Sequence, residues 1–178
     1  MRITLAMVSS VDGKTTHPTL HGWSSPEDQD HFRKLKTMYP IIIMGRKTYD
    51  TVKGELQLSL KTRRIVMTQN PDAHENAQVP GQLEFTNESP RMLVRHLTAE
   101  GVESALLVGG SDINQAFLKD KLITDCYITI EPRFFGNGKS IFTSDAIDIP
   151  LQLTDVTTLN TRGTLLLHYI IRYEHNAR

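Results

Sequence analysis

Short apolar runs alternate along the chain with stretches whose apolar residues recur at helical spacing. The runs predict strands near 3–8, 41–44, 65–67, 83–85, 104–108 and 125–131, and two longer strands near 153–160 and 165–173. Helices are predicted to begin between them near Pro26, Arg46, Pro90 and Asp112. Strands that alternate with helices form βαβ units, so this order predicts an α/β sandwich with a largely parallel sheet.

Two local signals sharpen this prediction. Around the third helix, Ser89 can cap the start, Pro90 suits the first helical position and Gly101 can end the helix. The last two strands are joined by the stretch NTRG, which predicts an antiparallel hairpin. We therefore expect a single domain over residues 1–178, with a mostly parallel sheet and an antiparallel C-terminal hairpin.

Composition narrows the classes of partner. Twenty basic residues balance twenty acidic ones, so no global field favours nucleic acid. A single cysteine excludes an intrachain disulfide and fits a reducing, cytoplasmic setting. The N-terminal apolar run is short and quickly interrupted by polar residues, which predicts a strand rather than a signal peptide or membrane span. The seven histidines are scattered, and we expect no metal.

The stretch RFFGNGKS ends like a phosphate-binding P-loop. That loop needs a glycine five positions before Gly138, where Arg133 stands, and the IFTSDAIDIP that follows does not begin a helix. Gly136 and Gly138 are instead expected to supply the left-handed positions of a turn that closes a strand.

Two strand-to-helix junctions are candidates for binding phosphate. In PIIIMGRKTYDTV, Gly45 separates an apolar strand from a helix whose first turn carries basic residues. Free N–H groups and the positive end of the helix dipole attract anions there. In ALLVGGSDINQAFL, two glycines precede a helix that Ser111 is predicted to cap, with Ile113, Ala116 and Phe117 facing inward. Either junction alone is also explained as a tight turn without a ligand.

Four stretches in order carry a family resemblance: AMVSSVDGK, WSSPEDQDHF, IIIMGRKTYDTV and LLVGGSDINQAFLKDKLITDCYITIEPRFFGNGKSIF. Together they resemble the dihydrofolate reductase-like superfamily, including the reductase domain that forms the C-terminal half of bacterial riboflavin-pathway deaminase-reductases. The resemblance covers nearly the whole chain. It implies a three-layer sandwich, often a homodimer, that uses NADPH to transfer hydride to a small heterocyclic substrate.

The resemblance also implies where NADPH would bind. Arg46 would meet the 2′-phosphate, and the loop 12–23 would close over the nicotinamide. The implied cofactor residues are Ala6 and Met7 beside the carboxamide, Gly45, Arg46, Lys47 and Thr48 at phosphate and ribose, Thr68 and Gln69 near the adenosine, and Gly109, Gly110, Ser111 and Asp112 on the opposite wall.

At the substrate end, Trp23, Asp28 and Phe32 match the spacing of dihydrofolate reductase. There the carboxylate binds the amidine edge of a pterin, and Thr129 matches the threonine that helps to hold it. We expect Asp28 to be partly buried with a raised pKa, so that it keeps a proton for the reduced C=N. Acids in a first helical turn are also favoured by the dipole alone. Ser25 and Trp23 match the substrate wall of the riboflavin reductases.

Three positions depart from the two families. Gln29 stands where an arginine would meet the substrate phosphate, Val108 replaces the acid before the glycine pair, and Asn114 replaces the aromatic residue near the hydride. Arg63 and Arg64 are the nearest arginines for a folate tail. A riboflavin-pathway aminopyrimidine is the favoured substrate and a pterin such as dihydrofolate is the alternative. A non-catalytic NADPH-binding protein is the third hypothesis.

Overall fold

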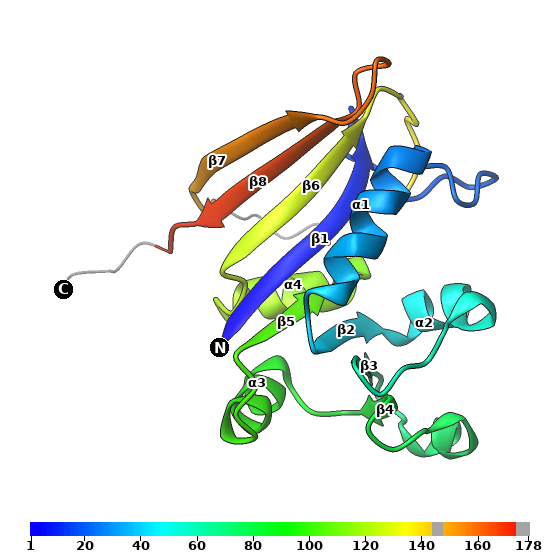
Figure 1. Cartoon of the computed structure of the whole chain (residues 1–178), viewed down its shortest axis with the longest axis vertical. Coiled ribbons are helices and arrows are strands. Elements are labelled where there is room, and N and C mark those ends of the chain that lie inside the picture. Colours follow the sequence, from blue (N-terminus) through cyan, green and yellow to red (C-terminus); the bar gives the residue numbers. More distant parts are fainter. Residues whose placement is uncertain (144–147, 174–178) are drawn as a thin grey trace.

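An eight-stranded sheet forms the middle layer of the computed structural model, which describes residues 1–143 and 148–173. The order across the sheet is β4-β3-β2-β5-β1-β6-β8-β7 (Figure 1). β1 to β6 pair in parallel, whereas β8 is antiparallel to both β6 and β7. The strands are β1 (Arg2–Ser10), β2 (Ile41–Gly45), β3 (Arg63–Met67), β4 (Leu83–Thr86), β5 (Ser104–Leu107), β6 (Asp125–Glu131), β7 (Leu151–Thr158) and β8 (Leu165–Ile171).

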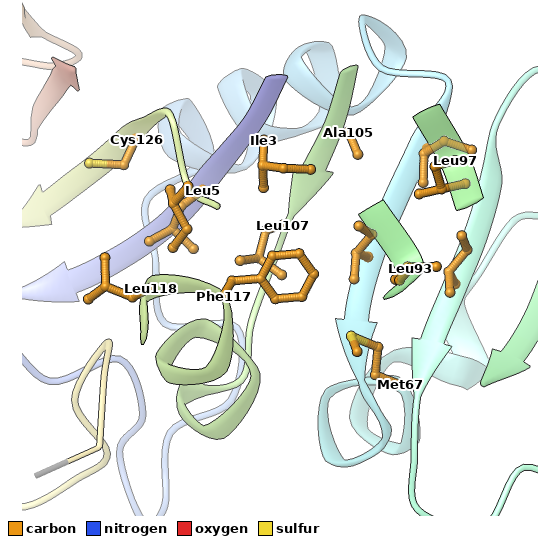
Figure 2. Close-up of a cluster of buried hydrophobic side chains, with 14 of the residues drawn as sticks. Ile3, Leu5, Met67, Leu93, Leu97, Ala105, Leu107, Phe117, Leu118 and Cys126 are labelled. Atoms are coloured by element: carbon orange, nitrogen blue, oxygen red, sulfur yellow. The ribbon is translucent and has the colours of Figure 1, made fainter. Parts of the chain in front are cut away.

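Helices cover the two faces of this sheet and complete three layers. The helices are α1 (Pro26–Thr37), α2 (Arg46–Val52), α3 (Pro90–Ala99) and α4 (Ser111–Lys119), with short 3₁₀ turns η1 (Lys53–Glu55) and η2 (Asp72–Ala77). On one face, Leu93 of α3 and Phe117 of α4 pack against Ile3 and Leu107 of the sheet (Figure 2). On the other face, Leu35 of α1 and Tyr49 of α2 pack in a second cluster. The expected α/β sandwich with its antiparallel hairpin is confirmed.

Local sequence signals explain most of the element ends. Ser25 and Ser89 cap α1 and α3, and their hydroxyls accept hydrogen bonds from the backbone N–H of Asp28 and Met92. The predicted cap of α4 was wrong. Gly110 occupies the cap position, and the Ser111 hydroxyl instead donates to the carbonyl of Ser140.

The inner face of α4 also differs from the prediction. Phe117 is fully buried as expected, but Ile113 and Ala116 are only half-buried. Asn114 and Gln115 are buried in their place. The helix therefore turns two amides inward at the end that lies nearest the glycine pair.

The GNGKS stretch forms a turn, as predicted, and the loop after β1 lies against it. Gly136 and Gly138 have positive φ angles of 67° and 149°. Asp12 accepts hydrogen bonds from the backbone N–H of Phe135 (3.0 Å) and Gly136 (2.6 Å). An added Cβ at Gly138 would lie 2.0 Å from the carbonyl oxygen of Thr16, so only glycine fits. Residues 144–147 of the segment predicted not to begin a helix lie outside the described residues.

Within the described ranges 1–143 and 148–173, no helix has both the length and the apolar character that a membrane span requires.

Candidate active site

The two predicted phosphate junctions meet at the centre of the sheet. β2 and β5 are neighbours, and the backbone N–H of Gly45 donates to the carbonyl of Gly109 at 2.7 Å. α2 leaves β2 toward the face of the second cluster, whereas α4 leaves β5 toward the face shown in Figure 2. Adjacent strands whose helices depart to opposite faces create a crevice at their carboxyl ends, which is the usual ligand position in such sheets.

Glycines at this crevice allow a ligand to approach the backbone closely. A Cβ at Gly45 would lie 2.8 Å from Cγ1 of Ile113, and one at Gly110 would lie 3.4 Å from Oγ1 of Thr48. Gly109 has a φ of 95°, and its added Cβ would lie 3.3 Å from the sulfur of Met7. The structure thus brings together the predicted residues Met7, Gly45, Thr48, Gly109 and Gly110.

The basic residues of the first junction are exposed and lightly held. Arg46 donates to Asp50 one turn further along α2 at 2.5 Å, and Lys47 lies 3.5 Å from Asp112 of α4. Exposed pairs of this kind contribute little to stability, so a phosphate can compete for both cations. The Lys47–Asp112 pair also joins the first turns of α2 and α4 across the crevice.

The remaining cofactor candidates lie along the same edge. Thr68 and Gln69 directly follow β3, which pairs with β2 on the side away from β5. Ala6 is buried in β1 beside Tyr127 of β6. Among the predicted cofactor residues, Ser111 is less available to a ligand, because its hydroxyl is already bonded to the carbonyl of Ser140.

Asp28 lies in the first turn of α1, and its side chain is buried against β6, which is on the other side of β1 from β5 and the glycine crevice. Its exposed fraction is 6%. Burial raises its pKa, and hydrogen bonds from Thr129 and Ser24 oppose this only in part. Thr129 pairs with Val8 of β1, two residues beyond Ala6. Ala6 and Val8 lie on one face of β1, about 7 Å apart along the strand.

A second buried carboxylate, missed by the sequence analysis, supports Asp28. Glu131 is 4% exposed and accepts hydrogen bonds from the backbone N–H of Ser25 (2.7 Å) and the hydroxyl of Thr164 (2.8 Å). It fixes the start of α1, and its negative charge also raises the pKa of Asp28. Polar residues at every second position of β6 were the available signal, since Thr129 and Glu131 share one face.

The predicted substrate residues lie in three places. Asp28, Ser25 and Thr129 lie together at the start of α1. Phe32 packs in the second core cluster, where the Lys36 ammonium lies 4.7 Å from its ring centre. Trp23 lies in the loop instead, edge-on to Phe135 at 4.7 Å.

A cavity of about 590 Å³ opens beside Trp23 and the start of α1. It is lined by loop residues 20–25, Pro26 at the start of α1, Glu131 at the end of β6, the following Pro132 and Arg133, and Arg162 of the β7–β8 turn. Its volume lies within the range of small-molecule sites. The lining arginines Arg133 and Arg162 were not among the predicted site residues.

The three departures have clear places in the structure. Gln29 is exposed and its side chain donates to the carbonyl of Ser24 at 3.0 Å. Val108 packs against the second core cluster. Asn114 is fully buried, donates to the carbonyl of Ile141 at 2.9 Å and leaves its own side-chain oxygen without a partner among the described residues. Arg63 is paired with Glu84 and Glu100, so it is not free for a ligand tail.

Other reactive side chains have structural roles. His168 bonds Thr154 (2.9 Å) and Asp125 (3.1 Å) and stacks on Tyr127. Burial raises the pKa of the Cys126 thiol to about 12, which fits an inert thiol. Among the residues that the structure describes, no group of histidine, cysteine or acidic side chains is arranged to hold a metal ion.

The fold is a doubly wound α/β domain with a glycine-lined crevice at its strand ends. The chain belongs to the RibD C-terminal domain family, whose model matches residues 1–165.

Comparisons with single proteins agree with this family. The chain is 28% identical to the uncharacterized protein YwjB of Bacillus subtilis over 72% of each chain. It is 31% identical to the dihydrofolate reductase HdrB of Haloferax volcanii, over 54% of this chain and 48% of that one. The deaminase/5-amino-6-(5-phosphoribosylamino)uracil reductase of Thermotoga maritima superposes with a TM-score of 0.73 at 18% identity, covering 96% of this chain and 56% of that one. The chain therefore spans about half of each of the two named reductases.

Proposed function

We propose that this protein is an NADPH-dependent reductase of a small heterocyclic substrate. The observation that carries the proposal is the buried Asp28 carboxyl, which is 6% exposed and is bonded by Ser24 of the cavity lining, with Glu131, 4% exposed, as its neighbour. A buried carboxyl with a raised pKa beside a ligand cavity is a common mark of an acid that holds a proton for catalysis. The relatives named as reductases support the same class of activity.

The glycine crevice fits a phosphorylated dinucleotide. Backbone N–H groups of the first turns of α2 and α4 would bind the pyrophosphate. Arg46 and Lys47 would exchange Asp50 and Asp112 for phosphate oxygens. When bound, NADPH would supply a hydride at its nicotinamide ring. Ala6 and Met7 would form the wall against which that ring lies.

The chain's own residues would supply orientation and the proton. The Asp28 carboxyl would bind the donor edge of the heterocycle through its two oxygens. In its protonated form it would give its proton to the nitrogen of the C=N bond that accepts the hydride, and Thr129 would keep the carboxyl in place. The loop 12–23 would exclude water from the reacting atoms.

Family membership favours a riboflavin-pathway aminopyrimidine as the substrate. Dihydrofolate or another pterin is the second candidate, because the Asp28–Thr129 hydrogen bond is the arrangement expected for pterin binding. The third, a non-catalytic NADPH-binding protein, is favoured by the inward amide of Asn114 where an aromatic residue was expected.

The test is NADPH consumption, followed by absorbance, with the phosphoribosylaminopyrimidine and with dihydrofolate in parallel. We expect turnover of the aminopyrimidine. Turnover of dihydrofolate alone would select the second candidate. Binding of NADPH with turnover of neither would select the non-catalytic protein, and absence of NADPH binding would overturn the proposal as a whole.

A further inference from the structure

The charges of the cavity beside Trp23 are unbalanced in a way that points to a ligand. Three of its lining residues carry a formal charge: Glu131, Arg133 and Arg162. Both oxygens of Glu131 are used inside the protein by Ser25 and Thr164. The two guanidinium groups therefore give the lining a net positive charge, and among the described residues the acid that pairs with one of them, Glu27 with Arg162, lies outside the lining.

The two arginines come from turns that the fold brings together. Arg133 is the second residue after β6, and among the described residues no ion pair engages its side chain. Arg162 lies in the β7–β8 turn with a side chain that is 64% exposed. Its guanidinium lies 3.6 Å from Glu27, which Asn160 also contacts at 3.1 Å. This long, exposed pair holds Arg162 at the rim without satisfying it.

The cavity adjoins the Asp28 site at the start of α1. Ser24 and Ser25 both line it, while Ser24 bonds the Asp28 carboxyl and Ser25 accepts from the Asp28 backbone N–H. A ring held by Asp28 would therefore direct a substituent past these serines into the cavity. Trp23 and both arginines line this cavity, so they lie within reach of such a substituent.

We infer that Arg133 and Arg162 form the binding site for an anionic group, a phosphate ester or a carboxylate, carried by the heterocycle that Asp28 holds. The inference rests on the proposed function for the identity of the ring. Gln29 of α1 stands where an arginine would meet the substrate phosphate, and Arg133 and Arg162 would supply that positive charge instead. Guanidinium groups bind both kinds of anion in a forked geometry, so the two sources share one chemistry.

The single tryptophan of the chain makes this site directly measurable. Because Trp23 lines the cavity, its fluorescence should report an occupant without any need for turnover. We would titrate the protein at constant ionic strength with ribose 5-phosphate, with neutral ribose and with glutarate. Saturable change with ribose 5-phosphate and none with ribose is the expected result; a saturable change with glutarate instead would assign the site to a carboxylate-bearing substrate.

Three variants test the residues. Arg133→Gln and Arg162→Gln should each weaken the anion by about tenfold or more, as expected when a charge-assisted hydrogen bond is lost. Glu27→Gln should strengthen it by up to about fivefold, because the competing carboxylate is removed. Arg172→Gln, an exposed arginine bonded to Gln152 outside the cavity lining, is the matched control and should change nothing.

Equal responses to ribose and ribose 5-phosphate, no response to any probe, or equal weakening by Arg172→Gln would overturn the inference. Its failure is distinguishable from failure of the proposed function. Anion binding without turnover of either heterocycle would leave the site and refute the reductase. Turnover whose KM is unchanged in both arginine variants would leave the reductase and refute the site.

Discussion

Two buried aspartates on one face of the sheet have opposite electrostatic environments. Asp28 is 6% exposed and Asp125 is 4% exposed, so burial is nearly equal. Burial raises the pKa of Asp28, and two hydroxyls are too few to reverse it. Burial also pushes the pKa of Asp125 upward, but hydrogen bonds from Arg2, Thr124 and His168 outweigh it and hold that pKa below its usual value.

The difference shows that the partners of a buried carboxylate, rather than its depth, decide its role. Arg2 contacts Asp125 through two nitrogens, at 2.9 and 2.6 Å, and so neutralises it. Asp28 has no cation of this kind and has Glu131 nearby. A compensated carboxylate stabilises the fold, whereas an uncompensated one is available for protons and ligands.

The largest effect is expected from Asp28→Asn. Removing the proton donor should lower kcat by about 10²- to 10⁴-fold while NADPH affinity stays unchanged, because the cofactor candidates lie on other elements. Steady-state kinetics and an NADPH titration would measure the two. Unchanged kcat would show that Asp28 does not hold the catalytic proton.

The same variant makes a prediction for stability. Because the folded pKa of Asp28 is raised, the wild type loses stability as pH rises from the unfolded value of 3.8 through the folded one. Asp28→Asn removes this loss, so its stability relative to wild type should increase with pH over that window. Urea unfolding at several pH values would measure it, and a decrease would contradict the assigned environment.

Arg2→Met should destabilise the protein by removing the cation that compensates the buried Asp125. Asp125 would stay buried with its main cation gone, which should cost about 1–3 kcal/mol of unfolding free energy. Urea denaturation measures the loss, and Arg172→Met is the control for removal of an arginine that does not contact Asp125. A neutral result would mean that Thr4, Thr124 and His168 suffice.

Thr129→Val tests the balance at Asp28 more gently. Loss of a hydrogen bond that lowers the pKa of Asp28 should raise that pKa further and move the alkaline limb of the kcat profile to higher pH. The rate at neutral pH should change by no more than about tenfold. Thr124→Val is the matched variant, because its hydroxyl donates to Asp125 at 2.8 Å, and it should leave the profile in place. Equal shifts in both variants would refute a specific role for Thr129.

A half-buried aspartate, Asp12 of the loop after β1, extends the comparison toward the surface and should show the smallest effect. Bonds from Ser10 and from the backbone N–H groups of Phe135 and Gly136 lower the pKa of Asp12 to about 2. These contacts therefore support the loop above pH 3.8 and are lost as pH falls toward 2. Amide-exchange protection of Phe135 and Gly136 should fall over that window, and in Asp12→Asn it should be low throughout. Protection that is independent of pH would contradict this.

Most of the fold could be predicted from the sequence, because neighbouring residues alone indicate the strands and the helix caps. Ser25 before Pro26 and Ser89 before Pro90 could be assigned from neighbouring residues alone. The inner face of α4 could not, because apolar spacing does not reveal that Asn114 and Gln115 turn inward. Their burial depends on the covering segment around Ile141, which is 27 residues away from Asn114.

The candidate site divides in the same way. Asp28 was predictable from its spacing to Trp23 and Phe32, as were the glycines at the strand ends. The polar alternation along β6 points to Glu131, but its bond to Ser25 could not be predicted, because the two residues are 106 positions apart. The meeting of Arg133 with Arg162 likewise depends on how the C-terminal hairpin pairs with β6, which no local pattern specifies.

The fit between the loop after β1 and the Gly138 turn limits how this protein can be re-engineered. Thr15 donates its backbone N–H to the carbonyl of Lys139 (2.7 Å), Lys139 donates its own to the hydroxyl of Thr16 (2.9 Å), and Gly138 leaves no room for a side chain. A chimera that imports only the loop of a relative would bring a new backbone path onto an unchanged turn. The two segments, more than 100 residues apart in the chain, are one exchangeable module.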